Sequence, residues 1–179
     1  MTPVVSATTL PAPSVRPEEP RIDVATASDD WAVMHLFGAL HDHNASLDPL
    51  FCLGPGWRDL LREHLDRVRS DDCGLSLLAW VDREPVGLLL MDGHEDPALF
   101  LHRHWAELLA LYVAPAARGN ALGRRLVEEG LTWARSRGFP RVQLYVTATN
   151  TPGRELYRST GFHLCQEIWR RDLVREDVP

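Results

Sequence analysis

Residues 111–124 read Leu111-Tyr112-Val113-Ala114-Pro115-Ala116-Ala117-Arg118-Gly119-Asn120-Ala121-Leu122-Gly123-Arg124. The segment begins as an apolar strand, stops at a proline, passes through a turn that contains glycine and opens an amphipathic helix. The first turn of a helix carries backbone N–H groups without partners, and the helix dipole adds positive potential there, so such a turn attracts phosphate. Glycine lets a bulky pyrophosphate approach the backbone. The segment therefore predicts an anion-binding turn.

Other phosphate-binding turns fit this segment less well. A dinucleotide fingerprint requires Gly-x-Gly-x-x-Gly after the first strand of a βαβ unit, with an acidic residue about 20 positions later. A P-loop requires lysine followed by serine or threonine. Here three residues separate Gly119 from Gly123, and the motif lies late in the chain. A purely structural loop with two glycines is the remaining alternative, and the flanking sequence argues against it.

Residues 107–126, together with Asn150, Tyr157 and the Gly161-Phe162 pair, resemble the Gcn5-related N-acetyltransferase (GNAT) family. In that family a Val-x-Pro-x-x-Arg-Gly-x-Gly-x-Gly/Ala turn holds the pyrophosphate of acetyl-CoA. The chain departs from this pattern at Ala121, where the family usually has glycine. The added methyl narrows the allowed backbone angles and crowds the phosphate, so it affects cofactor affinity, although we expect binding to survive.

The resemblance covers residues from about 21 to about 172 and implies that acetyl-CoA is the cosubstrate. It makes the following residues candidates for cofactor binding: Leu111, Tyr112, Val113, Arg118, Gly119, Asn120, Ala121, Leu122, Gly123, Arg124 and Asn150. Arg118 and Arg124 flank the turn and would supply cationic partners for phosphate.

Apolar periodicity predicts strands at residues 21–25, 75–81, 85–91, 105–113, 142–147 and 162–172. It predicts helices from about 31, at 57–69, at 122–137 and at 150–160, with loops at 41–55 and 92–103. This order predicts an α/β (α+β) fold: one GNAT-like domain at residues 21–175, with a mixed, mostly antiparallel sheet of six to seven strands and helices on both faces. Residues 1–20 are expected to form a disordered, proline-rich tail.

Glu107 is the candidate general base. An alkylammonium with a pKa of about 10 leaves only about one molecule in a thousand as a nucleophile at neutral pH, so acetyl transfer to an amine needs a base. Glu107 lies six positions before Val113 on a mostly apolar strand. Partial burial there would raise the pKa of its carboxyl group. In the family this strand position often carries the base, and the resemblance assigns that role to Glu107. A solvated or ion-paired glutamate is the alternative.

Tyr157 is the candidate general acid. By resemblance, Tyr157 donates a proton to the departing CoA thiolate, while Asn150, seven residues earlier on nearly the same helix face, contacts the pantetheine arm. A packed aromatic residue is the alternative interpretation of Tyr157. The resemblance also implies that the fourth and fifth strands splay apart, leaving a backbone N–H near Tyr112 to stabilise charge on the thioester carbonyl.

The sequence leaves the acceptor open beyond an amine-bearing small molecule or peptide. In the family, the loop between the first two helices shapes the acceptor pocket, so the resemblance makes His43, Asn44 and Phe51 candidates for substrate contact. No metal site is expected, because the histidines at 41, 43, 102 and 104 have neither helical spacing nor a nearby thiolate. The leading hypothesis is an N-acetyltransferase that uses direct attack in a ternary complex. The alternative is a non-catalytic acyl-CoA-binding or sensing module of the same fold, motivated by Ala121.

The net charge of -6 disfavours nucleic acid as a partner and suits a cationic acceptor. Cys52, Cys73 and Cys165 are an odd number without metal-like or disulfide-like spacing, which favours free thiols in a reducing cytoplasm. No apolar run approaches the roughly 20 residues that cross a bilayer, and we expect neither a membrane partner nor a leader peptide. A homodimer through an exposed sheet edge or the last strand is compatible with the pattern.

Overall fold

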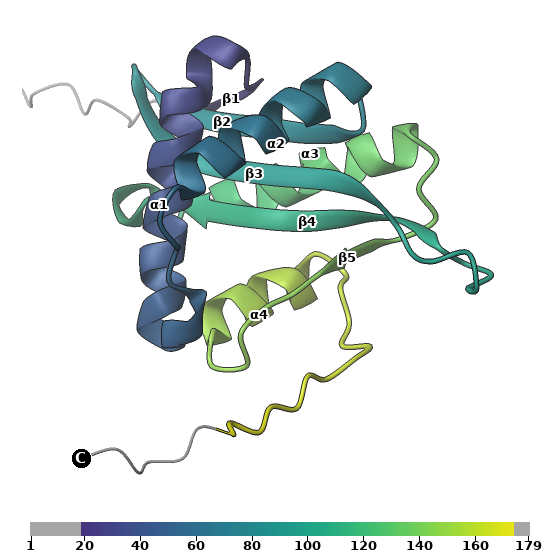
Figure 1. Ribbon diagram of the computed structural model, residues 1–179. Helices are drawn as coiled ribbons and strands as arrows, with labels where there is room; N and C mark the ends of the chain where they lie inside the picture. The colour runs from purple at the N-terminus through teal and green to yellow at the C-terminus, as the bar shows by residue number, and fades with distance from the viewer. Residues whose placement is uncertain (1–18, 174–179) are drawn as a thin grey trace, which may run out of the picture.

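A mixed sheet with helices on both faces organises residues 19–173, the part of the chain that this computed structural model describes (Figure 1). Its centre is formed by three consecutive apolar segments, β2 (Gly74–Val81), β3 (Glu84–Glu95) and β4 (His104–Val113), each antiparallel to the next. The short strand β1 (Arg21–Val24) pairs antiparallel with β2, and β5 (Val142–Leu144) pairs parallel with β4. The strand order is therefore β1-β2-β3-β4-β5.

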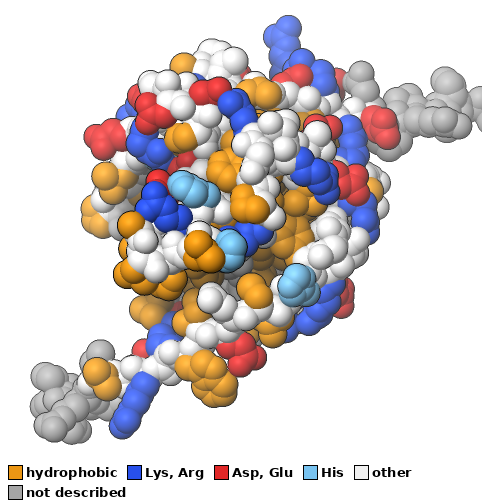
Figure 2. All heavy atoms as spheres, turned by 90° about the vertical axis from the view of Figure 1, so that its right-hand side faces the viewer, with side chains coloured by type: hydrophobic (Ala, Val, Ile, Leu, Met, Phe, Trp, Pro, Cys, Tyr) orange, Lys and Arg blue, Asp and Glu red, His pale blue; other side chains and the backbone are white. Residues whose placement is uncertain are grey.

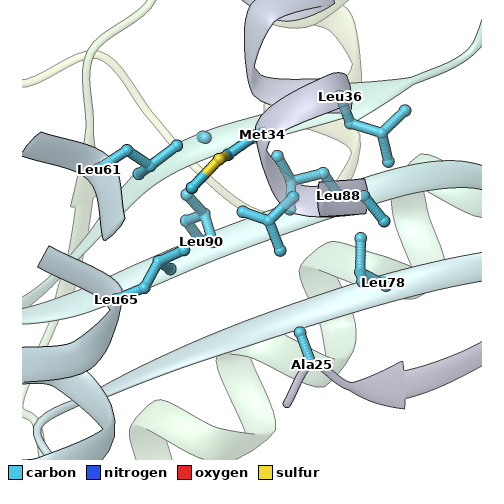
Figure 3. Packing of buried hydrophobic residues seen from close by; sticks show 11 residues of the cluster. Ala25, Met34, Leu36, Leu61, Leu65, Leu78, Leu88 and Leu90 are labelled. Atoms are coloured by element: carbon cyan, nitrogen blue, oxygen red, sulfur yellow. The ribbon is translucent and has the colours of Figure 1, made fainter. Parts of the chain in front are cut away.

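Two hydrophobic clusters fill the two faces of this sheet. Helices α1 (Asp30–Leu47) and α2 (Trp57–Asp71) cover one face, and α3 (Leu122–Ser136) covers the other. Because side chains alternate along a strand, Leu88 and Leu90 point towards α1 and α2, while Leu89 and Met91 point towards α3. Figure 3 shows the first cluster, in which side chains of α1 and α2 meet those of the strands.

The remaining elements are short. The described part of the chain also forms three 3₁₀ turns, η1 (Ala27–Asp29), η2 (Pro49–Phe51) and η3 (Pro115–Ala117). Helix α4 (Thr151–Ser159) follows β5 and contains no fully buried residue. Within residues 19–173, every helix is too short or too polar to cross a membrane.

A bulge in β4 determines which face Glu107 occupies. Leu90 pairs with Ala110 and Met91 pairs with Leu108, so Leu109 is an extra residue in β4. The insertion reverses the alternation, and Leu108 packs in the α3 cluster although Ala110 packs in the α1–α2 cluster. Glu107 therefore lies on the α1–α2 face of the sheet.

The predicted mixed, mostly antiparallel sheet with helices on both faces is confirmed, but the predicted strand number of six to seven is wrong. The described residues form five strands. The segment 162–172, predicted as the last strand, pairs with no other strand among the described residues. The outer edge of β5 is open among the described residues, but the segment leaves α4 along the outside of the molecule (Figure 1), and Nη1 of Arg170 donates to Oδ2 of Asp48 at 2.8 Å.

Three boundaries also differ from the prediction. The first helix continues into the expected loop, because polar residues on an exposed helix face do not stop a helix. It ends at Leu47 because the residue before Pro49 disfavours helical backbone angles. Strand β3 continues past Met91 to Glu95, because residues 92–95 pair with residues 104–107 of β4. Strand β5 stops at Leu144 rather than at residue 147, where its pairing with β4 ends. Residues 1–18 of the predicted tail (1–20) and residues 174–175 of the predicted domain (21–175) lie outside the described residues.

Candidate active site

Helix α3 begins without a side-chain cap, and this leaves a run of unpaired backbone donors. Within residues 19–173, the N–H groups from Gly119 to Arg124 donate to no backbone or side-chain acceptor. The first paired group is the N–H of Arg125, which donates to the carbonyl oxygen of Ala121 at 3.0 Å. Gly119 has φ +86° and open space where a Cβ would stand. The turn therefore offers consecutive donors and room for a bulky anion.

The same turn forms one wall of a pocket of about 370 Å³. Helix α4 contributes the facing residues Pro152, Leu156 and Ser159. The turn contributes Val113, Ala117, Arg118, Gly119, Ala121, Leu122, Gly123 and Arg124. The structure thus brings together most of the predicted cofactor residues, while Leu111, Tyr112, Asn120 and Asn150 do not line the pocket. A second pocket of about 390 Å³ lies at β1 and shares no residue with this one.

The two predicted phosphate-binding arginines are anchored on the two sides of this pocket. The Nε of Arg118 donates to the carbonyl oxygen of Val113 at 3.0 Å, and its guanidinium lies 5.9 Å from the ring centre of Tyr112. The Nη1 of Arg124 donates to the carbonyl oxygen of Ser159 at 2.9 Å. Both guanidinium groups are therefore positioned near the turn, and each has further donors available.

Strands β4 and β5 separate beside the turn. Their pairing consists of Ala106 with Val142, Glu107 with Gln143 and Leu108 with Leu144. From Leu109 to Val113, β4 has no strand partner on that side among the described residues. The expected splay is present, and backbone donors of this part of β4 are free to face a ligand.

Glu107 lies on the α1–α2 face among titratable neighbours from β3. It pairs across the strands with Asp92, and its Oε2 lies 3.9 Å from Nδ1 of His94. Its side chain is 19% exposed. Burial raises the pKa of Glu107 above its usual value, His94 opposes this shift, and the negative charge of Asp92 adds to it. A carboxyl group with a raised pKa is suited to accept a proton near neutral pH.

Sequence reasoning missed Asp92 and His94, because it placed residues 92–103 in a loop. The signal that could have found them is the length of the partner strand, since a ten-residue β4 needs a comparably long β3.

The Oδ2 of Asp92 accepts from Nη2 of Arg67 on α2 at 2.6 Å, and its Oδ1 is buried without a partner in the described part of the chain. Burial lowers the pKa of the neighbouring His64 despite the charge of Asp92.

Tyr157 lies on α4 and packs edge-on against Phe162, with the ring centres 5.8 Å apart. Burial raises the pKa of Tyr157 to about 12. No hydrogen bond within residues 19–173 engages this hydroxyl group. Asn150 caps the same helix, because its Oδ1 accepts from the N–H of Gly153 at 3.1 Å. The side-chain oxygen of Asn150 therefore stabilises the start of α4, and its Nδ2 remains available to donate a hydrogen bond.

The predicted acceptor residues lie at the end of α1 and in η2. His43 is exposed, Phe51 is 43% exposed, and the backbone oxygen of Asn44 accepts from the N–H of Asp48. In the described residues, no hydrogen bond or ion pair connects this group to Glu107 or to the turn. Nor do residues 19–173 contain a group of three or more His, Cys, Asp or Glu side chains placed to hold a metal ion.

Comparison with known sequences places these features in a family. Residues 39–162 match the acetyltransferase (GNAT) family. Mycothiol acetyltransferase of Thermobifida fusca is 35% identical over 116 residues, which cover 65% of this chain and 27% of that protein. Mycothiol acetyltransferase of Acidothermus cellulolyticus is 49% identical over 75 residues, which cover 42% and 22%. The chain therefore spans about a quarter of the length of these curated relatives.

Solved structures of the same fold include aminoglycoside N-acetyltransferase AAC(6')-Iy in complex with CoA. The TM-score is 0.67 and the sequence identity is 16%, and the match covers 89% of this chain and 100% of that chain. Aminoglycoside 6'-N-acetyltransferase of Acinetobacter haemolyticus has a TM-score of 0.65 and 16% identity over 87% and 99%. At such low identity these structures support the fold alone. Because the family match extends over most of the chain and includes the turn, Glu107 and Tyr157, the chain belongs to the acetyltransferase (GNAT) family.

Proposed function

We propose that the protein transfers an acetyl group from acetyl-CoA to an amine by direct attack within a ternary complex. The observation that carries this proposal is the run of unpaired N–H groups from Gly119 to Arg124, beside the separation of β4 and β5. Consecutive backbone donors at a helix start bind a diphosphate, and the separated strands leave space and free donors for an extended arm. Acetyl-CoA supplies the activated thioester. Arg118 and Arg124 add positive charge at the two sides of the pocket.

Glu107 takes the proton that the attacking amine must lose. Its raised pKa supports this assignment, since a base works best when its pKa lies near the pH at which it operates. The Nδ1 of His94 lies 3.9 Å from Oε2 of Glu107, beside the carboxyl group that takes this proton. The carboxylates of Glu107 and Asp92 also favour a cationic acceptor by charge attraction.

Tyr157 supplies a proton to the leaving thiolate. Its hydroxyl group is protonated at neutral pH, as that of an ordinary tyrosine is, and no hydrogen bond within residues 19–173 occupies it. A backbone N–H of β4 near Tyr112 stabilises the negative charge that develops on the thioester oxygen. The free edge of β4 beyond Leu108 supports this role.

The acceptor is an amine-bearing small molecule or peptide, and the end of α1 with η2 forms part of its pocket through His43, Asn44 and Phe51. The aminoglycoside N-acetyltransferases of the same fold support an amine acceptor. We place the protein in the cytoplasm, without nucleic acid or membrane as partners. The net charge of -6 and the three free cysteines support that assignment.

Calorimetry with CoA tests the turn, and the chain offers a matched control. Gly119 and Gly138 have φ of +86° and +76°, and both have open space at the Cβ position. Gly119→Asp and Gly138→Asp therefore introduce the same charge and similar backbone strain, but only the first places a carboxylate in the turn. We expect CoA binding by the wild type and by Gly138→Asp, and at least tenfold weaker binding by Gly119→Asp. Equal binding by both variants would remove the turn from the site.

A thiol-release assay with acetyl-CoA and a panel of amines separates catalysis from sensing. Turnover with one class of amine supports the transferase. CoA binding without turnover on any amine favours the non-catalytic module, and absence of binding at millimolar CoA rejects both. The non-catalytic module was considered because Ala121 replaces the usual glycine of the turn. Ala121 nevertheless adopts the left-handed backbone conformation of a glycine, and the neighbouring N–H groups are unpaired, which weakens that reason.

A further inference from the structure

His94 lies between Glu107 and a second carboxylate, Asp96. The Nδ1 of His94 is 3.9 Å from Oε2 of Glu107, and its Nε2 is 3.2 Å from Oδ1 of Asp96. The side chain of Glu107 is 19% exposed, whereas those of His94 and Asp96 are 40% and 34% exposed. Figure 2 shows the side of the molecule where β3 and β4 are joined, and histidine side chains reach the surface there. The three side chains therefore connect the candidate base to solvent.

Two neighbours hold the ring of His94 in one orientation. The ring packs on the indole of Trp105, with the ring centres 4.3 Å apart. Trp105 is buried, and its Nε1 donates to Oδ2 of Asp96 at 3.3 Å. Nη2 of Arg141, before β5, lies 3.8 Å from the same oxygen. Asp96 is thus fixed by groups other than His94, and its Oδ1 is left to bind the ring.

Asp96 determines where the neutral ring of His94 carries its proton. An ionised carboxylate only accepts hydrogen bonds, so the ring nitrogen beside Asp96 must be the donor, Nε2–H. A neutral imidazole has one N–H group, and Nδ1 then carries a lone pair on the side of Glu107. No hydrogen bond among residues 19–173 occupies this lone pair. His94 is therefore placed to accept a proton from Glu107.

The other charged groups near Glu107 come from β3 and α2. Asp92 pairs with Glu107 across the strands, and Arg67 of α2 compensates its charge by donating to Oδ2 at 2.6 Å. Nε2 of His64, also on α2, lies 3.9 Å from the same oxygen of Asp92. Among the described residues, only His94 brings a basic nitrogen as close as 3.9 Å to the carboxyl group of Glu107. A proton on Glu107 therefore has His94 as its nearest acceptor.

We propose that His94, oriented by Asp96, takes over the proton that Glu107 removes from the attacking amine, so that the two side chains act as one base. This inference rests on the proposed acetyl transfer. As the amine nitrogen bonds to the thioester carbon, its N–H bond breaks and an O–H bond forms on Glu107. That O–H bond then breaks as Nδ1 of His94 gains the proton, which leaves a carboxylate and an imidazolium beside Asp96. The imidazolium returns the proton to solvent.

The distance between the two groups allows this transfer after a small movement. Direct transfer needs a hydrogen bond between Oε2 of Glu107 and Nδ1 of His94, and closing 3.9 Å to such a bond takes a shift of about 1 Å. Catalytic hydrogen bonds are commonly long before substrate binds and shorten in the complex. His94 and Asp96 do not touch the acceptor. Both are positioning residues that act through Glu107.

Nitrogen NMR of labelled histidine rings tests the pair without an assay of turnover. Comparison with His94→Gln assigns the signals of His94 among the eight histidines. We expect the neutral ring to carry its proton on Nε2. In Glu107→Gln the ring should lose its second proton at lower pH than in the wild type, because an anionic neighbour is gone. A neutral ring protonated on Nδ1, or an identical titration in Glu107→Gln, would overturn the proposal.

Glu95→Gln is the matched control for this titration. Glu95 precedes Asp96 on the same hairpin, and its Oε1 lies 3.8 Å from Nε2 of His104. The substitution should therefore change the titration of His104 and leave that of His94 as in the wild type. A change at His94 of the same size as in Glu107→Gln would show that the ring responds to any lost charge, which contradicts a specific pair.

The pH dependence of acetyl transfer tests the pair in turnover. His94→Gln should lower kcat/KM at neutral pH by about tenfold, less than the loss of Glu107, which still accepts the first proton. Its rate should rise with pH over a lower range than in the wild type, because Glu107 then titrates alone. Free imidazole should restore part of the rate of His94→Ala but not that of Glu107→Gln. His104→Gln, at a side chain that is 60% exposed, should keep the wild-type profile.

These outcomes separate the inference from the function on which it rests. An active wild type whose pH profile is unchanged in His94→Gln, or a His94→Ala variant that imidazole does not rescue, would overturn the role of His94 and leave acetyl transfer intact. A wild type without turnover on any amine would overturn the proposed function itself, whatever the NMR titration shows.

Discussion

Ala121 occupies a backbone conformation that glycine adopts at lower cost. Its φ of 55° and ψ of 10° lie in the left-handed region, where the Cβ of an L-residue approaches the following carbonyl oxygen. The residue sits within the row of unpaired donors and lines the pocket. The fold therefore tolerates strain at the point where the phosphates are expected to bind.

Replacing Ala121 with glycine should tighten CoA binding. Removing the methyl opens the approach to the neighbouring N–H groups, and we expect a gain of about 1 kcal/mol, or about fivefold in Kd. The relieved backbone strain is present with and without ligand and therefore adds to the free energy of unfolding instead. Calorimetry measures the change. Ala116→Gly is the control, since Ala116 is exposed in η3 and has ordinary backbone angles, and its affinity for CoA should not change. Unchanged or weaker binding by Ala121→Gly would show that the methyl does not obstruct the ligand.

Glu107→Gln should lower kcat/KM at neutral pH by about a hundredfold or more, as expected when a general base is removed. Because the pKa of Glu107 is raised, the wild-type rate should rise with pH above the usual glutamate range as the carboxyl group ionises, and the variant should lose that limb. Glu95→Gln, a change at an exposed position on the same strand pair, is the control. A variant that keeps the wild-type pH profile would exclude Glu107 as the base.

The same substitution has a predicted effect on stability. A folded-state pKa above the unfolded value means that the ionised carboxyl group is disfavoured in the folded protein, so stability falls as pH rises through the raised pKa. Glu107→Gln should therefore match the wild type at pH values below the usual glutamate range and unfold at higher denaturant concentration at neutral pH. A less stable variant at neutral pH would show that neighbouring groups stabilise the carboxylate.

At the scale of elements, Arg67 connects α2 to the sheet through Asp92, whose side chain is 12% exposed. Arg67→Ala leaves that carboxylate without its donor, and we expect a loss of about 1 kcal/mol or more in the free energy of unfolding. Arg62→Ala, on the same helix, breaks an exposed pair with Asp59 and should cost less than about 0.5 kcal/mol. Chemical denaturation measures both. Equal losses in the free energy of unfolding would show that the ion pair of Arg67 with Asp92 stabilises the fold no more than a surface ion pair does.

Elements whose signals are local could be predicted from the sequence. The turn from Val113 to Gly123 was identified because proline and glycine act on their own segment. The register of β3 against β4 could not be identified, since residues such as Asp92 and His94 belong to a strand only through pairing with β4. Nothing in the sequence around Leu109 marks the bulge, although the bulge turns Glu107 towards its neighbours on β3.

At the scale of the whole molecule, the order of elements was predicted up to the last strand. The error there has a physical cause: residues 162–172 have the composition of a strand, but composition does not report where the chain runs after α4, and the segment does not pair although the outer edge of β5 is open among the described residues. The candidate site was also predicted only in part. The turn residues converge on one pocket, whereas the predicted acceptor residues His43 and Phe51 are placed by the unforeseen extension of α1.

The short pairing of β5 with β4 has a consequence for motion. Three residue pairs join β5 to the rest of the sheet, whereas the antiparallel meander from β1 to β4 is paired along most of its length. A region held by so few ladder bonds unfolds locally at a lower free energy than the meander does. We therefore expect β5 and α4 to open together while β1 to β4 and α3 stay in place, which gives a spent coenzyme held between α3 and α4 a way out.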